Sequence, residues 1–553
     1  MGTLDWQGLL GYNPAEPMIF TRFFFWGFFL LVLLVDALVY RRQPWRSAWL
    51  FAVSLFFFWK TSGFFVGLLF FSISMDYTLA RVSGATEDRN RKRLLLAASV
   101  TVNLLVLAYF KYAHFVVDNI NAILGTQLEA VNYLARWANA AWDGHFVENK
   151  ILLPVGISFY TFHCMSYAID VYRGKLKPVR SLVDFGFYVS FFPQLVAGPI
   201  VRAADFIPQI YQEYRLSRQQ FGMAVFWILN GLGKKLLIGD YMAVNFIDRV
   251  FSDPLRHTGF ENLMALFGYS LQVYADFSGY TDVAIGVALL MGFTIKTNFN
   301  SPYKARHVGE FWQRWHMSLS SWLRDYLYIP MGGNRSGSLF SWIMLGVLGL
   351  AVVLLSGSLW TAVGLALLLG LGALASRLSP VAGNFLTTNL NLLLTMLIGG
   401  LWHGASWMFV IWGGLNGLGL VVHKSWKRWR PWAPLERWWS RAVAVALTFT
   451  FITFTRVWFR SDSLEKAGQV LGQMRNNFGL DVAGEVLWGF RSVFLVMALG
   501  LAVHWIPETL KARYRAAFAA LPLWAMGLAS AAVVLLIYQT ITAQMVPFIY
   551  FQF

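Results

Sequence analysis

Long apolar segments recur along nearly the whole chain of 553 residues, and they constrain the fold more than any other feature. The segment 26–40, WGFFLLVLLVDALVY, is one example. A helix needs about 20 mostly apolar residues to cross a membrane. Only 13% of the residues are charged, whereas soluble domains carry roughly a quarter. The chain is therefore predicted to be an integral membrane protein.

The apolar segments are long and continuous, which predicts helices rather than the alternating strands of a membrane barrel. The candidate spans are 18–40, 48–80, 94–113, 151–172, 183–198, 222–240, 262–292, 339–356, 359–376, 386–402, 405–422, 441–459, 488–505 and 521–541. We expect an all-α polytopic fold of roughly 11–14 transmembrane or re-entrant helices. Without an internal repeat or linker, one membrane-embedded domain is predicted over 1–553, with its core at 150–422, N-terminal helices at 18–113 and C-terminal helices at 441–541.

Short basic loops predict the orientation of these helices. Segments 41–46, 81–93, 173–180 and 424–432 are rich in Lys and Arg, and such loops stay on the cytoplasmic side. Two of them flank 48–80, so that segment is predicted to be a hairpin of two spans that turns at Thr61-Ser62-Gly63. The N-terminus is then expected outside the cytoplasm. These loops carry most of the net charge of +17, so no nucleic-acid partner is expected.

Several kinds of chemistry lack their sequence signals. Cys164 is the only cysteine, which excludes an internal disulfide and a thiolate metal cluster. The sequence has no HExxH motif, no phosphate-binding Walker loop and no GxSxG elbow. We therefore expect no metal site, no nucleotide-driven transport and no serine-hydrolase chemistry.

Three polar segments interrupt the apolar pattern, and the first is 274–286, YADFSGYTDVAIG, with Asp276, Tyr280 and Asp282. A carboxylate at membrane depth costs several kcal/mol unless it is paired or faces a wet cavity. Two interpretations stay open. These residues form a polar core that joins two helices, through a buried ion pair or a tyrosine hydrogen bond, or they belong to a functional site.

The second polar segment is 311–335, FWQRWHMSLSSWLRDYLYIPMGGNR, which is too polar to face lipid yet dense in Trp and Tyr. Its polar candidates are Arg314, His316, Ser318, Arg324, Asp325 and Arg335. Pro330 and Gly332-Gly333 are predicted to end its helix. Polar backbone is tolerated at membrane depth beside a water-filled cavity, so this segment is predicted to line an aqueous funnel.

The third polar segment is 399–407, GGLWHGASW, which places His403 in a very apolar region. The glycines, Ala405 and Ser406 beside it allow neighbouring backbone or a ligand to approach closely. A buried imidazole stays neutral and can accept a proton. A single buried histidine is often only a packed core residue, but His316 lies in a similar Trp-rich, glycine-punctuated segment. The two together favour a catalytic interpretation.

Five segments now resemble, in order, the membrane-bound O-acyltransferase (MBOAT) family, and within it the branch of alginate O-acetyltransferase membrane subunits. They are 151–174, 191–202 (FFPQLVAGPIVR), 274–286, 311–335 and 399–417. The resemblance implies a ring of tilted helices around a central funnel in the bacterial inner membrane. The N-terminus, which the basic loops place outside the cytoplasm, is then expected in the periplasm. The resemblance also implies that His403 is the catalytic histidine and His316 a second active-site histidine.

The resemblance further implies acetyl-CoA as the acyl donor, without a metal. Candidates for donor binding are Arg314, Trp315, Ser318, Arg335 and Trp402, and Lys304 and Arg306 could attract the coenzyme A phosphates. The implied partners are membrane lipid, a periplasmic acetyltransferase of the SGNH-hydrolase type and an exported-polysaccharide biosynthesis complex. The motifs leave open which polymer is acetylated, and whether acetyl rests on His403.

Two alternatives stay open at this point. One is a D-alanyl transfer protein of the same family. The other is a polytopic transporter or flippase without acyl chemistry, which would predict an internal repeat.

Overall fold

The computed structural model describes residues 10–14, 16–142, 147–356, 358–430 and 437–540. Within these ranges every regular element is a helix, which confirms the all-α fold class. The chain divides into two compact units, which we describe separately. The first comprises Met1–Leu107, Leu153–Asn300 and Phe478–Phe553, and the second Ala108–Leu152 and Ser301–Asn477. The single domain expected from the sequence stays a prediction.

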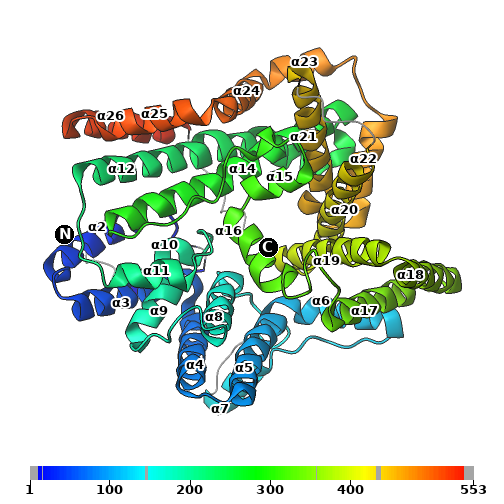
Figure 1. Ribbon diagram of the computed structural model, residues 1–553. Coiled ribbons are helices and arrows are strands. Elements are labelled where there is room, and N and C mark those ends of the chain that lie inside the picture. Colours follow the sequence, from blue (N-terminus) through cyan, green and yellow to red (C-terminus); the bar gives the residue numbers. More distant parts are fainter. Residues whose placement is uncertain (1–9, 15, 143–146, 357, 431–436, 541–553) are drawn as a thin grey trace. The chain divides into compact units, whose positions relative to one another are not determined.

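The first unit contains one long helix of 32 residues, α14 (Gly259–Leu290), and many shorter ones (Figure 1). Its other α-helices are α2 (Phe23–Val39), α3 (Gln43–Ser62), α4 (Val66–Ala85), α5 (Arg89–Leu107), α8 (Ile157–Tyr172), α9 (Leu182–Ser190), α10 (Phe192–Leu195), α11 (Ala203–Ile210), α12 (Arg218–Leu232), α13 (Asp248–Ser252), α23 (Ala483–Gly489), α24 (Arg491–Trp505), α25 (Glu508–Ala519) and α26 (Leu523–Thr540). Its shorter turns are η1 (Gly63–Phe65), η3 (Gly233–Asp240), η4 (Ala243–Ile247) and η5 (Pro254–Arg256).

The second unit contains the segments 311–335 and 399–407. Its α-helices are α6 (Ala113–Leu124), α7 (Tyr133–Trp142), α15 (Val308–Arg314), α16 (Met317–Leu323), α17 (Leu339–Ser356), α18 (Leu359–Leu378), α19 (Pro380–His403), α20 (Trp407–Trp429), α21 (Trp438–Arg460) and α22 (Leu464–Asn476). The turns η2 (Ala108–Tyr112), η6 (Pro302–Lys304) and η7 (Arg324–Tyr328) complete it. The segment 311–335 is thus broken into short helices that end before Pro330, as predicted.

The described residues include five helical stretches that are long and apolar enough to cross a membrane. They are Gln43–Ala85, Arg89–Leu124, Arg218–Ser252, Pro380–His403 and Trp438–Arg460. Two sharply bent helix pairs at the C-terminal end raise the number to as many as seven. The predicted range of eleven to fourteen also counted short and re-entrant segments, and shorter apolar helices such as Phe23–Val39 are present as well. The chain is a multi-pass membrane protein.

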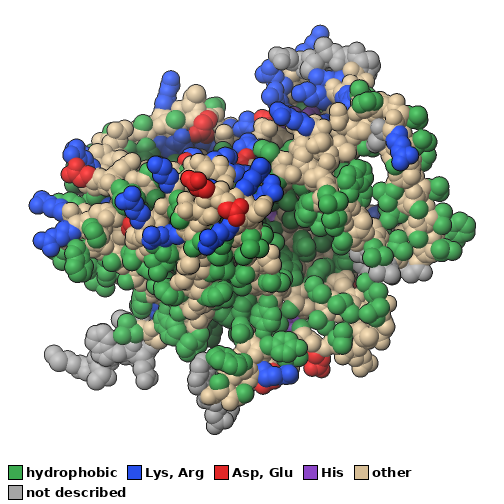
Figure 2. All heavy atoms as spheres, turned by 60° about the horizontal axis from the view of Figure 1, so that its bottom comes forward, with side chains coloured by type: hydrophobic (Ala, Val, Ile, Leu, Met, Phe, Trp, Pro, Cys, Tyr) green, Lys and Arg blue, Asp and Glu red, His purple; other side chains and the backbone are tan. Residues whose placement is uncertain are grey.

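Large apolar side chains are exposed along these helices, as a membrane protein requires. Leu38 and Trp360 are each 83% exposed, and many leucines and phenylalanines resemble them. On the face seen in Figure 2, hydrophobic side chains form broad areas, whereas Lys and Arg gather in clusters. Such apolar surface far exceeds what a soluble monomer leaves in water, so lipid is its solvent.

The helical stretch 43–85 breaks where the sequence predicted, because Gly63 ends α3 with a positive φ of 60°. A Cβ atom at Gly63 would also lie 2.7 Å from the ring of Tyr12. The two helices do not pack on each other as the predicted hairpin would. Helix α3 packs mainly against α9, and α4 mainly against α8 and α5.

Charged residues inside the apolar helices of the first unit have hydrogen-bonding partners. Asp36 of α2 accepts from the Arg46 guanidinium of α3 at 2.9 Å, and both are almost fully buried. Asp76 of α4 accepts from Ser99 and Asn103 of α5. Each contact ties one helix to the next, which offsets the cost of a charge in an apolar setting.

Helices α12 and α14 run side by side through the first unit (Figure 1). Their backbones meet at two glycines, since a Cβ atom at Gly231 would lie 2.4 Å from the Gly279 carbonyl oxygen. Beside this contact, Lys234 Nζ binds Asp282 Oδ2 at 2.7 Å. Lys235 binds both Asp276 and Asp240. The carboxylates of α14 therefore pair with lysines of η3, the turn that follows α12 directly, which is one of the two interpretations left open by the sequence.

We predict that Asp282→Ala lowers the free energy of unfolding by about 3–5 kcal/mol, because it strands the partly buried Lys234 ammonium. Unfolding in detergent, followed by circular dichroism, measures the change. The double variant Lys234→Met/Asp282→Leu should recover most of the loss. As a control, Asp205→Ala removes the exposed pair with Lys296 and should change stability by about 0–1 kcal/mol. Equal effects of the two single variants would contradict the structural role of the ion pairs between η3 and α14.

Candidate functional site

His403 is the last residue of α19, and its ring is enclosed by aromatic side chains. The ring centroid lies 5.0 Å from Trp402, 5.1 Å from Trp412 of α20 and 5.6 Å from Phe459 of α21. The planes of all three rings are nearly perpendicular to the plane of the imidazole. Only 4% of His403 is exposed. The imidazole is thus held in a largely apolar cage.

The cage depends on a close crossing of α19 and α20. A Cβ atom at Gly400 would lie 2.3 Å from the Phe409 carbonyl oxygen and 3.0 Å from Gly413 Cα. A Cβ atom at Gly413 would lie 2.4 Å from the Met396 carbonyl oxygen. Only glycine allows these backbones to approach so closely, and this contact sets Trp412 against His403.

His316 lies just before α16, in a strained backbone conformation. Its φ of 44° and ψ of 53° fall in the left-handed region that favours glycine. The side chain is fully buried, and burial lowers the pKa of this imidazole to about 3, so it is neutral at pH 7. Strain of this kind often accompanies functional sites.

The structure brings the two predicted histidines together around one indole. The His316 ring centroid lies 6.1 Å from Trp402, and Trp402 in turn contacts His403 at 5.0 Å. The two residues are 87 positions apart in the chain, so their proximity arises from the fold of this unit.

A cavity of about 400 Å³ reaches His403. Its walls come from α15, α16, η7, α19 and α20, and the lining residues are Trp312, Gln313, Met317, Leu319, Ser320, Ser321, Leu323, Arg324, Tyr328, Leu392, Thr395, Met396, Gly399, His403, Trp412 and Leu420. Gln313 and Arg324 are exposed, whereas His403 and Thr395 are buried. The walls of the cavity therefore include both exposed polar side chains and the buried imidazole. Its volume is within the usual range for small-molecule sites, and His316 is not among its lining residues.

The remaining candidates of segment 311–335 are spread around these walls. Arg314 is bound to Glu310 at 2.9 Å. Arg324 pairs with its neighbour Asp325 at 2.8 Å on the surface. Ser318 is partly buried beside the cavity-lining residues, and Arg335 is exposed.

Trp315 is buried beneath a cation that the sequence analysis did not single out. The Arg456 guanidinium of α21 lies 4.8 Å from the Trp315 ring centroid and 5.6 Å from that of Tyr303. Arg456 is only 5% exposed, so this cation–π contact is largely desolvated and correspondingly strong.

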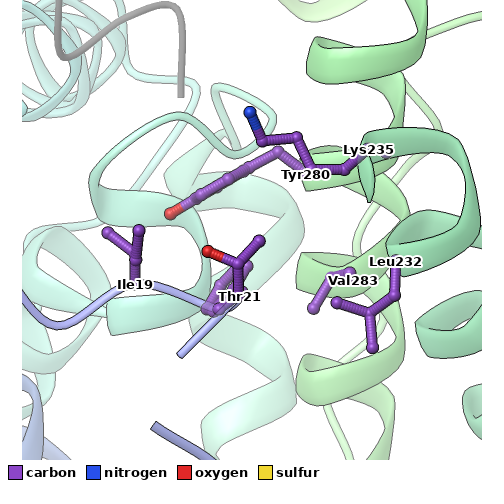
Figure 3. Close-up of a pocket in the computed structure, with 8 residues that line it drawn as sticks. Ile19, Thr21, Leu232, Lys235, Tyr280 and Val283 are labelled. Carbon is purple, nitrogen blue, oxygen red and sulfur yellow. The ribbon is translucent and has the colours of Figure 1, made fainter. Parts of the chain in front are cut away.

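Asp276, Asp282 and Tyr280 lie in the first unit and do not belong to the His403 cage. Tyr280 stacks on Phe20 at 4.6 Å. It also lines a cavity of about 20 Å³ with Ile19, Thr21, Leu232, Lys235, Gly279 and Val283 (Figure 3). Such a cavity has room for about one water molecule. These residues fit a structural polar core.

Sequence analysis missed Lys111 and Tyr112, which adjoin the end of α19. Lys111 Nζ donates to the carbonyl oxygens of Trp402 and His403, and Tyr112 Oη donates to that of Leu401 at 2.8 Å. The sequence did contain a sign that Lys111 is unusual, because this lysine follows 17 uncharged residues, 94–110, in an apolar span. Its target could not be deduced from sequence, since the partners lie about 290 positions away.

No group of three or more His, Cys, Asp and Glu side chains that could hold a metal ion occurs in the described part of the chain.

Comparisons with known proteins converge on one family. The model of the membrane-bound O-acyltransferase family, MBOAT, matches residues 176–360, which include His316. The chain is 35% identical over 439 residues to the probable alginate O-acetylase AlgI of Pseudomonas syringae pv. tomato, covering 78% of this chain and 70% of that protein. It is 32% identical to the peptidoglycan O-acetyltransferase of Helicobacter pylori, covering 84% and 80%. A teichoic acid D-alanyltransferase of Bacillus subtilis is 24% identical, covering 56% and 69%.

We predict that Gly400→Ala lowers stability in detergent by about 1–3 kcal/mol, because the added methyl overpacks the α19–α20 crossing. Gly414→Ala is the matched control on α20, since its Cβ atom would meet only Leu397 Cδ2 at 3.4 Å. Alanine is the better helix former, so that control should be neutral or slightly stabilising. Thermal unfolding in detergent distinguishes the two, and a harmless Gly400→Ala would show that the helices do not cross this closely.

Proposed function

Because the chain belongs to the membrane-bound O-acyltransferase family, we propose that it carries acetyl from cytoplasmic acetyl-CoA across the bacterial inner membrane to O-acetylate an exported polysaccharide. Family membership makes it a multi-pass membrane O-acyltransferase. Acetyl as the acyl group is supported by its relatives, which include an alginate O-acetylase and a peptidoglycan O-acetyltransferase. A periplasmic N-terminus is proposed from the basic loops, which favour the cytoplasm, and it requires that α3 and α4 each cross the membrane although they do not pack as a hairpin.

The observation that carries this proposal is that the buried His403 lines a cavity whose walls also include the exposed polar side chains of Gln313 and Arg324. Acyl transfer needs a base beside the reacting carbonyl and room for two substrates. A cavity of about 400 Å³ with Ser320, Ser321 and Thr395 in its walls offers that room and a few hydroxyl groups for orientation.

His403 acts as the base in the proposed reaction. Its neutral imidazole accepts the proton of an acceptor hydroxyl while the oxygen attacks the thioester carbonyl. The carbon–sulfur bond then breaks, and coenzyme A leaves as the thiol after reprotonation. Alternatively, the imidazole itself takes the acetyl group and passes it on. General base catalysis supplies about 10²–10⁴-fold, so orientation in the cavity provides the rest.

His316 was expected to orient the acceptor or to stabilise the oxyanion, but because it does not line the cavity we propose that it supports the site indirectly, by holding Trp402 against His403. This assignment rests on its place one indole away from His403 and on its strained backbone. Trp402 contacts both imidazole rings and thereby fixes the position of one histidine relative to the other.

The acyl donor enters, in this proposal, at the exposed end of the cavity. Arg324 lines that end, and its pair with Asp325 is exposed and therefore weak. Arg314 is less available because Glu310 neutralises it. The acetyl group is handed to a periplasmic acetyltransferase of the SGNH-hydrolase type within a polysaccharide-export complex. No metal is required.

D-alanyl transfer from a carrier protein is the second candidate, and the teichoic acid D-alanyltransferase relative favours it. That relative is less similar and covers less of the chain than the O-acetylating ones. A flippase without acyl chemistry would be indifferent to acetyl-CoA. The acyl donor that the protein requires therefore distinguishes the O-acetyltransferase, the D-alanyltransferase and the flippase.

We predict that purified His403→Ala transfers labelled acetyl from acetyl-CoA at least about 10²-fold more slowly than the wild type, because it lacks the base. His316→Ala should also be slowed. Acetyl release is followed by scintillation counting, with size-exclusion profiles to establish folding. His257→Ala, a histidine of the other unit, serves as the control and should keep the wild-type rate. Near wild-type transfer by folded His403→Ala would refute the assignment, and a preference for a D-alanyl carrier would select the second candidate.

A further inference from the structure

Helix α19 ends at His403 without the usual backbone cap. Helix ends leave their last carbonyl groups unsatisfied, and a residue in the left-handed conformation commonly closes them. Gly404 is instead extended, with a φ of −163° and a ψ of 151°. Among the described residues, its backbone NH makes no capping hydrogen bond. The end of the helix that carries the proposed base must therefore be satisfied by other groups.

Side chains from the turn η2 meet this end. Lys111 Nζ donates to the Trp402 carbonyl and, at 3.2 Å, to the His403 carbonyl. Tyr112 donates to the Leu401 carbonyl at 2.8 Å. Three successive carbonyls of the last turn are thus bound by two adjacent side chains. The Lys111 ammonium also lies 5.8 Å from the Trp402 ring centroid, the same indole that separates the two histidines.

The backbone of η2 explains how adjacent residues can act on one target. Residues Ala108–Tyr112 form a π-helical turn between α5 and α6. A π-turn inserts an extra residue into the helix, and such turns frequently occur at functional sites. Lys111 and Tyr112 are the last two residues of this turn, so its wider geometry changes the directions of their side chains.

A lysine in an apolar span is expensive and is usually explained by function. The simplest explanation is that the ammonium extends to the lipid headgroups, as lysines near helix ends do. Here it is engaged by two carbonyls of another helix. A positive charge at the C-terminal end of a helix is also favoured by the helix dipole. Both points indicate that Lys111 acts on α19.

We propose that Lys111 is a positioning residue for the proposed base, and that its ammonium clamps the last turn of α19 so that the His403 ring keeps its place at the end of the cavity. This inference rests on the proposed function for its kinetic consequence, but not for its structural one. The groups that face His403 are Trp402, Trp412, Phe459, Lys111 and, beyond Trp402, His316. Lys111 is the one among them that fixes the backbone of His403 itself.

The test uses the full-length protein in nanodiscs and compares Lys111→Met with Lys111→Arg. Loss of the clamp lets the imidazole move, and misplacement of a catalytic group by about 1 Å can cost 10²-fold. We expect Lys111→Met to lower kcat by about 10- to 100-fold with little change in the KM for acetyl-CoA. Lys111→Arg keeps the charge and donors and should recover much of kcat. Tyr112→Phe removes a donor but no charge and should lower kcat less.

Lys150→Met is the matched control, since Lys150 is an exposed lysine of the same unit, and it should keep the wild-type kcat. Wild-type kcat in Lys111→Met, or a change confined to KM, would overturn the inference. A kcat of Lys111→Arg as low as that of Lys111→Met would also overturn it. The same holds if Tyr112→Phe lowers kcat as much as Lys111→Met does.

A readout without acetyl transfer separates this inference from the proposed function. In ¹⁵N-histidine NMR spectra, the His403 ring signals are those that disappear in His403→Gln. We expect them to shift and broaden in Lys111→Met and to stay near their wild-type positions in Lys111→Arg. Unchanged His403 signals in Lys111→Met would refute the clamp, even if transfer were slow. A shifted signal in a protein that transfers no acetyl would support the clamp and refute the function. If Lys111→Met does not fold, Lys111→Arg decides, because displaced His403 signals with a slow kcat in that variant contradict the inference.

Discussion

The near contact of two helix backbones, α19 and α20, holds the proposed active site together. Gly400 and Gly413 let the helices approach to a distance that any Cβ atom would prevent. Lipid supplies no hydrophobic driving force between helices, so close packing of small residues takes its place. The crossing brings Trp412 and, through α21, Phe459 around His403. Asn416 extends the contact by donating to Thr455 of α21.

A second constraint is that polar groups inside apolar helices must find partners. In the first unit they find each other, as in the pairs Arg46–Asp36, Lys234–Asp282 and Lys235–Asp276. In the second unit the polar groups gather around a cavity instead, where Thr395, Ser320 and His403 share the walls. The same chemical cost thus yields ion pairs between helices in one unit and a lined cavity in the other.

The sequence predicted much of this from residue type alone. The apolar segments indicated helices and the Trp-rich polar segments indicated a cavity wall. The two histidines were selected because both lie in Trp-rich, glycine-punctuated polar segments. The sequence could not predict which residues that are distant in the chain contact each other. Only the fold brings Lys111 to the α19 carbonyls and Arg456 to Trp315. No local sequence pattern indicates such contacts. The predicted hairpin at 48–80 was wrong for the same reason. The sequence indicated the break at Gly63 but not the helices against which α3 and α4 pack.

The central claim is that acyl chemistry takes place at the buried end of the cavity, beside His403. A cryo-EM map of the full-length protein with a non-hydrolysable acetyl-CoA analogue tests it most directly. The account predicts density for the acetyl carbonyl within hydrogen-bonding reach of the His403 imidazole, next to Trp412 and Thr395, with the rest of the analogue leading out past Arg324. Density for the acetyl group elsewhere in the protein, with this cavity empty, would contradict it.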